Sequence, residues 1–214
     1  MKKITIIQIT CLVIILVLTF GCDRRTKISV PTQFEDTILP LAEGNYWLFV
    51  DSTFVNGEPD SVFTKKMGIT GATQISHQGD KKWVYHWTWF DMPEDKPQVR
   101  KSLVTNEPDG LVYYGQRMGA SYTEFNRRMF IKYPAEEEEE WTYTQGAIVK
   151  CLSVSTPFET PSGVFNAHKY RMTLGEITQY LYYVPEVGYV GMEEVRNGQK
   201  VLSRRLTEYV VAVD

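Results

Sequence analysis

The segment Lys81-Lys-Trp-Val-Tyr-His-Trp-Thr-Trp-Phe90 holds the residues best suited to chemistry in this chain. On a strand, Trp83, Tyr85, Trp87 and Trp89 share one face, because alternate side chains point to the same side of a sheet. A row of aromatic rings offers a platform on which sugar rings stack, or an apolar surface for a partner. The alternative is that the row forms a wall of the core, where burial stabilises the fold by roughly 1.5–3 kcal/mol per large side chain. These four residues are the candidate ligand-binding site.

Other residues that could support catalysis or metal binding do not form a recognisable pattern. The histidines His77, His86 and His168 are scattered, and the chain contains no zinc-protease, nucleophile-elbow or glycine-rich phosphate motif. The acidic run 136–140 carries oxygen ligands of the kind calcium prefers, but consecutive glutamates cannot all converge on one ion, which favours a solvated loop. We therefore predict no enzymatic activity, no catalytic residue, no metal site and no cofactor.

The first 22 residues, MKKITIIQITCLVIILVLTFGC, have the pattern of an export signal: two lysines followed by an apolar run from Ile4 to Phe20. The Gly21-Cys22 that follows resembles the lipobox of bacterial lipoproteins, in which the cysteine is acylated and the preceding peptide is removed. An uncleaved membrane helix and ordinary secretion are the competing interpretations, because the run has the minimum length of a membrane span.

The lipobox resemblance implies an anchor and a layout. Cys22 would carry palmitate-type acyl chains and bind membrane lipid, since each buried CH₂ contributes about 0.8 kcal/mol. Residues 1–21 are then the signal peptide, 22–40 the lipidated cysteine with a polar tether, and 41–214 a single β-rich domain. The expected location is the bacterial cell envelope, with the domain facing the periplasm. Cys151 would be the one cysteine left for the domain, so no internal disulfide forms, and its strand-like surroundings favour a buried apolar role over a nucleophile.

Composition limits the classes of partner. The chain has a formal net charge of -3 and a sequence pI near 5.7, whereas a nucleic-acid-binding domain carries a basic surplus. Its 5 Trp, 13 Tyr and 10 Phe provide ample material for a core, which excludes a disordered chain. No nucleic-acid partner is expected.

The pattern after the tether is that of an all-β protein. Alternating β-branched and aromatic runs are separated by turn signals such as Asn56-Gly57 and Asn197-Gly198. These runs predict strands over 45–55, 62–71, 81–90, 98–105, 110–115, 123–133, 146–156, 164–174, 177–184, 187–195 and 200–212. We expect a curved antiparallel meander of about ten strands, closed into a barrel or packed as a sandwich.

An internal echo suggests two related halves. The segments PLAEGNYWLF (40–49) and PAEEEEEWTY (134–143) share a proline, a tryptophan seven residues later and an aromatic residue two beyond that. On a strand, the tryptophan and the second aromatic residue point to the same face, so each pair is expected to enter a core.

The same phrases resemble a group of poorly characterised bacterial envelope lipoproteins. In that group a P-L-x-x-G-x-x-W phrase opens the first strand, as in residues 40–47, and a Y-Y-x-P-x-V-G-x-V phrase closes the domain, as in residues 182–190. The phrases are structural, so the resemblance implies no catalytic residues. The expected function is a non-catalytic structural or assembly role with an envelope partner. The alternative is a glycan- or lipid-binding module that uses Trp83–Trp89 or a barrel interior.

Overall fold

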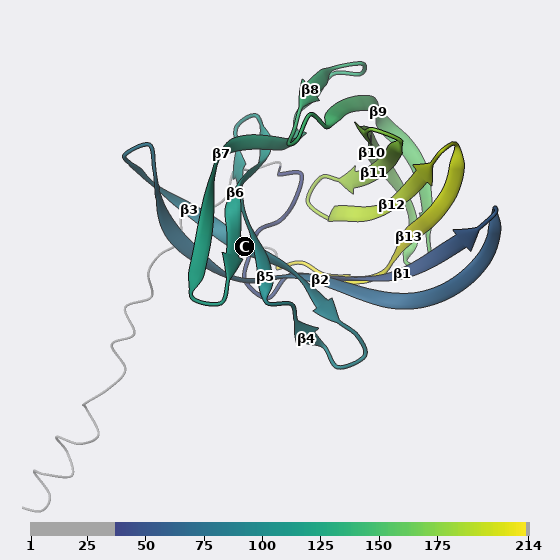
Figure 1. Cartoon of the computed structure of the whole chain (residues 1–214), viewed down its shortest axis with the longest axis horizontal. Coiled ribbons are helices and arrows are strands. Elements are labelled where there is room, and N and C mark those ends of the chain that lie inside the picture. The colour runs from purple at the N-terminus through teal and green to yellow at the C-terminus, as the bar shows by residue number, and fades with distance from the viewer. Residues whose placement is uncertain (1–36, 213–214) are drawn as a thin grey trace, which may run out of the picture. The chain divides into compact units, whose positions relative to one another are not determined.

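The computed structural model describes residues 37–212, apart from the side chains of residues 124 and 125. Its strands form one antiparallel 13-stranded sheet, shown in Figure 1. They are β1 (Tyr46–Val55), β2 (Glu58–His77), β3 (Asp80–Asp91), β4 (Lys96–Pro97), β5 (Arg100–Glu107), β6 (Gly110–Met118), β7 (Ser121–Lys132), β8 (Glu140–Thr142), β9 (Ile148–Thr160), β10 (Gly163–Leu174), β11 (Ile177–Val184), β12 (Gly188–Arg196) and β13 (Gln199–Val210). The predicted all-β antiparallel fold is confirmed. The described residues contain no helix, and thus none long and apolar enough to cross a membrane.

The strand order divides the sheet into two meanders. It runs β7-β6-β5-β3-β2-β1-β13-β12-β11-β10-β9-β8, with the short β4 paired to β3. The chain therefore zigzags outward from β1 to β7, passes to β8, and zigzags back to β13, which pairs with β1. The two segments of the sequence echo place Trp47 in β1 and Trp141 in β8, the first strand of each meander. Among the described residues the end strands β7 and β8 do not pair, so the sheet curves but stays open (Figure 1).

Tight turns set the register of the long hairpins. Asn56 and Gly57 between β1 and β2 both have positive φ (52° and 84°), and so do Asn197 and Gly198 between β12 and β13 (49° and 77°). Two consecutive positive φ angles give the turn whose twist matches that of paired antiparallel strands. Asn-Gly tolerates this backbone at little energetic cost, which is why the dipeptide predicted both hairpins.

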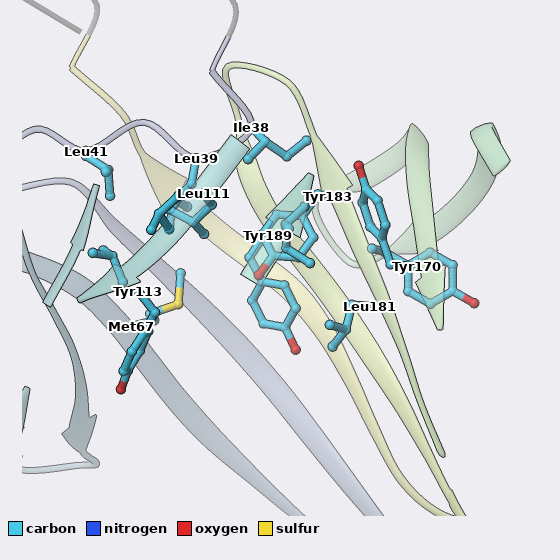
Figure 2. Packing of buried hydrophobic residues seen from close by; sticks show 14 of the residues in the cluster. Ile38, Leu39, Leu41, Met67, Leu111, Tyr113, Tyr170, Leu181, Tyr183 and Tyr189 are labelled. Atoms are coloured by element: carbon cyan, nitrogen blue, oxygen red, sulfur yellow. The ribbon is translucent and has the colours of Figure 1, made fainter. Parts of the chain in front are cut away.

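The segment before β1 is part of the core. Ile38, Leu39 and Leu41 are at most 1% exposed and belong to the same buried cluster as Leu111 and Tyr189 (Figure 2). Backbone contacts fix its position, because the amide of Glu186 donates to the carbonyl of Thr37 (3.0 Å). The Asn106 side chain likewise donates to the carbonyl of Leu39 (2.8 Å). Residues 38 and 39, which the sequence analysis assigned to the tether (22–40), therefore pack in the core of the domain.

Gly188 leaves the space that this segment occupies. A Cβ built on Gly188 would lie 2.7 Å from a methyl carbon of Leu39 and 3.2 Å from the Trp47 ring. Its φ of 96° is also a conformation that other residues rarely adopt. The first residue of β12 can therefore approach Leu39 and Trp47 only because residue 188 lacks a side chain.

Candidate ligand-binding face

The predicted aromatic stripe lies on β3, with its members on one face as expected. Tyr85 is 7% exposed, whereas Trp83, Trp87 and Trp89 are half-buried. Trp87 and Trp89 pack against the core, and Trp83 lies opposite the exposed Gln74 of β2. Tyr85 is thus the most buried member of the stripe, and the three tryptophans keep part of their surface exposed.

Trp89 continues into a chain of aromatic rings that crosses the sheet. Its ring centroid lies 6.0 Å from Phe49 of β1, which lies 5.3 Å from Tyr189 of β12. From Tyr189 the contacts continue to Tyr183, with 5.3 Å between the ring centroids. Tyr183 lies 6.2 Å from Tyr170, which lies 6.0 Å from Trp141. We call these six residues the aromatic band: Phe49, Trp89, Trp141, Tyr170, Tyr183 and Tyr189. The band joins strands from both meanders.

A second group of rings extends the same face around Trp87. The Trp87 ring lies 5.9 Å from Phe130 of β7, which lies 5.0 Å from Tyr143 just after β8. Tyr113 of β6 meets Tyr143 edge-on at 6.4 Å, and its hydroxyl shares a 2.7 Å hydrogen bond with Ser102. These contacts connect β3 and β6 with the end strands of the open sheet.

A buried ion pair lies beside the aromatic band. The Nε and Nη2 atoms of Arg204 donate to the two carboxylate oxygens of Asp51 at 2.7 and 2.5 Å, and the Asp51 side chain is 1% exposed. The Arg204 guanidinium carbon lies 4.4 Å from the centre of the Trp89 ring and 5.8 Å from that of Phe49. Burial alone would lower the pKa of Arg204, but the hydrogen bonds and charge of Asp51 and contact with Tyr189 raise it above its usual value.

The tyrosines of the aromatic band stay protonated at neutral pH. Burial raises the pKa of Tyr189 to about 12 and raises those of Tyr183 and Tyr170 as well. Their hydroxyls therefore serve as hydrogen-bonding groups and not as bases. The face combines partly exposed indole rings with a fixed cation, an arrangement suited to stacking and polar contacts with a ligand.

Arg204, Asp51 and Tyr189 were not singled out from the sequence. A signal for the pair did exist, because Asp51 continues the inward-facing alternation of Trp47 and Phe49, and Arg204 precedes the buried Leu206 by two residues. A charged side chain in the apolar phase of a strand indicates a buried charge with a partner. Nothing in the sequence indicates that the partner is 153 residues away.

The remaining candidates, Cys151 and the three histidines, are buried or half-buried. Cys151 is fully buried, and burial raises the pKa of its thiol. His77 meets the Tyr114 ring edge-on at 4.8 Å, and burial lowers the pKa of His168. Burial and the nearby Arg117 and Lys101 charges lower the pKa of His86 to about 4.

The acidic run is partly held by ion pairs. Glu138 pairs with Lys150 and Glu139 with Lys132, both at 2.5 Å. Within residues 37–212, no group of three or more His, Cys, Asp or Glu side chains is arranged to hold a metal ion.

A second polar cluster surrounds Glu107 on the first meander. The Tyr114 hydroxyl donates to its carboxylate at 2.5 Å, Lys82 at 2.9 Å and Arg127 at 2.7 Å. Burial favours the neutral acid, but these hydrogen bonds and the Arg127 charge outweigh it and lower the Glu107 pKa to about 2. The carboxylate is therefore committed to its internal partners.

No protein-family model matches the chain, and no curated protein matches its sequence. Two solved structures are similar to it. One is a Bacteroides fragilis protein provisionally described as exported, with a YmcC-like fold; it has a TM-score of 0.44 and 12% identity over 82% of this chain and 99% of that chain. The other is a protein from Parabacteroides distasonis provisionally described as a lipoprotein; it has a TM-score of 0.43 and 14% identity over 83% of this chain and 100% of that chain. Cys22 and the signal sequence lie outside the described residues.

Proposed function

We propose that the protein is a lipid-anchored, non-catalytic component of the bacterial cell envelope with a structural or assembly role. The observation that carries this proposal is the placement of Gly21-Cys22 directly after two lysines and an apolar run. Several acyl chains on Cys22 would hold the chain on a bilayer almost permanently. From Cys22 to Ile38 the chain can span at most about 58 Å, which limits how far the domain could lie from the membrane surface.

Acylation of Cys22 is tested by growing cells that express the full chain with radioactive palmitate. We expect labelling of the wild type and none of Cys22→Ala, while Cys151→Ala stays labelled as the matched control. Equal labelling of Cys22→Ala would overturn the anchor. A hydrolytic activity of the purified chain that one substitution abolishes would overturn the non-catalytic part.

A second candidate function is ligand binding on the aromatic face. The observation that favours it is that Trp87 and Trp89 stay partly exposed although both pack against the core, and that the Arg204 guanidinium lies over the Trp89 ring. Large rings left partly open beside a fixed cation are typical of sites for sugars or apolar ligands.

Tryptophan quenching and mass spectrometry test this second function. In the full chain, Trp47 and Trp141 are replaced by phenylalanine so that Trp83, Trp87 and Trp89 report. We expect partial acrylamide quenching, and lower quenching when a copurified lipid or an added glycan is bound. Fully protected indoles, together with no lipid in native mass spectra and no glycan-array signal, would exclude this site.

A further inference from the structure

Basic side chains gather on the face of the second meander that points away from the aromatic band. Lys169 and Arg171 flank the buried Tyr170 on β10, so they project from the opposite side of the sheet. Neighbouring strands add further cations to this surface, which we call the basic face: Lys150, Lys169, Arg171 and Arg205, with Tyr180 and Tyr182 between them. The concentration is unexpected in a chain whose net charge is negative.

Strand register places like charges directly opposite each other. Arg171 pairs with Lys150 of β9 on one side and with Tyr180 of β11 on the other. Like charges at directly opposite positions destabilise a sheet, so their presence needs a compensating anion. Glu138 forms an ion pair with Lys150 (2.5 Å between Nζ and the carboxylate oxygen), which balances the charge of that lysine but not the charge of Arg171.

Lys169 and Arg171 lack such compensation. Among the side chains that the structure describes, no carboxylate lies within ion-pair distance of either cation. Lys169 instead lies over the rings of Tyr180 (5.0 Å) and Tyr182 (5.6 Å). Glu193, the nearest acid along the register, opposite Tyr180, is already bound by Arg205 (2.8 Å) and Lys200 (3.1 Å). Two cations are thus available to an external anion.

Tyr180 is half-buried and lies directly opposite Arg171, and the Lys169 ammonium lies over its ring. An aromatic ring stacks on the apolar face of a sugar, while arginine binds a carboxylate with two parallel hydrogen bonds. The positive charges are half-buried and Lys169 lies along the sheet, whereas binding to a membrane surface relies on cations that project from the protein. The surface therefore fits an acidic sugar polymer better than lipid headgroups.

We propose that the basic face binds an acidic polysaccharide, with Arg171 and Lys169 contacting carboxylates and Tyr180 stacking on a sugar ring. This site lies on the opposite side of the sheet from the aromatic band, and it does not depend on the lipid anchor.

The test measures binding of the full chain, purified in detergent, to polygalacturonate by affinity electrophoresis. Neutral dextran and phosphatidylglycerol vesicles are the comparison ligands. We expect retardation by polygalacturonate only. In Lys169→Gln/Arg171→Gln the affinity should fall by about tenfold or more, a change of about 1.4 kcal/mol, because both charge-assisted contacts are removed. Lys81→Gln/Lys96→Gln, which makes the same change in net charge on β3 and β4, should bind like the wild type.

Further outcomes decide the remaining cases. Tyr180→Ala leaves the charge unchanged and should also weaken binding, which keeps the test informative if the double variant is poorly folded. No binding of the wild type to polygalacturonate overturns the proposal. If the control variant weakens binding to polygalacturonate equally, binding depends on net charge and the proposal is wrong. Binding to the vesicles alone would also overturn the proposal, because the basic face would then bind a membrane surface.

Discussion

Replacing Arg204 by methionine should destabilise the domain far more than the loss of one surface ion pair. The guanidinium makes two hydrogen bonds with Asp51, whose carboxylate is 1% exposed. In Arg204→Met that carboxylate stays buried without its countercharge. Removal of one partner from a buried pair costs about 3–5 kcal/mol, whereas exposed pairs contribute about 0–1 kcal/mol.

The companion variant is Asp51→Leu/Arg204→Met, which removes both charges and leaves apolar side chains. Exchange of a buried pair for apolar residues is often neutral or stabilising, so we expect the double variant to recover to within about 1–2 kcal/mol of the wild type. It does not recover fully, because the stacking of Arg204 on Trp89 is also lost.

The assay is urea unfolding of the full chain followed by circular dichroism, with the four proteins of the double-mutant cycle compared at the same pH. A loss of about 3–5 kcal/mol matters, since domains are typically stable by about 5–15 kcal/mol in total. The Lys150–Glu138 pair provides the control, because the Glu138 side chain that stays behind in Lys150→Met is 72% exposed. The reasoning is refuted if Arg204→Met lowers the unfolding free energy no more than Lys150→Met does.

The other predictions concern packing and titration. Gly188→Ala should destabilise the domain by about 2–4 kcal/mol in urea unfolding, because the new Cβ would clash with Leu39 and the φ of residue 188 is 96°. The control is Gly198→Ala, where φ is 77° but no atom lies within 4 Å of the new Cβ, and it should lose less stability. The pKa of His86 is lowered to about 4, so between pH 6.5 and 4 its imidazole is protonated in the unfolded state but neutral in the folded state. Up to about 3 kcal/mol of stability should therefore be lost as the pH falls over that range. His86→Leu should lack this part of the loss; identical pH profiles would contradict the buried neutral ring. For Glu107 the lowered pKa of about 2 stabilises the fold above pH 4.5 and this contribution disappears as the pH falls towards 2, so Glu107→Gln should be about 2–3 kcal/mol less stable at pH 7. A gap between the two proteins that does not narrow in acid would show that the carboxylate charge is not responsible.

Local sequence signals predicted most of the strands. Each of the eleven predicted runs corresponds to an observed strand, because alternation and turn residues act within a few positions. β4 and β8 escaped prediction, since strands of 2 and 3 residues are too short to show alternation. β2 is longer than predicted: a register shift between Ile69 and Ala72 interrupts the alternation, and the strand continues past it to His77.

The candidate site was only partly accessible to sequence reasoning. Trp87 and Trp89 were found because four aromatic residues alternate within one strand. Their ring neighbours come from strands that are distant in sequence, and no local pattern indicates that β1 meets β12 at Phe49 and Tyr189. The basic face was missed for the same reason, since Lys150, Arg171 and Tyr180 become neighbours only through strand register.

The pairing of β1 with β13 has a kinetic consequence. Tyr46 lies opposite Val210, so the first strand of the sheet waits for the last one to be made. Contacts of such large sequence separation slow folding, because the entropy of closing the long loop is lost before the contact forms. During synthesis the edge of β1 would remain open until the C-terminal residues emerge, and the chain would be vulnerable to proteases and to mispairing throughout that interval. Removal of the last ten residues should therefore lower the yield of folded protein much more than their small share of the core suggests.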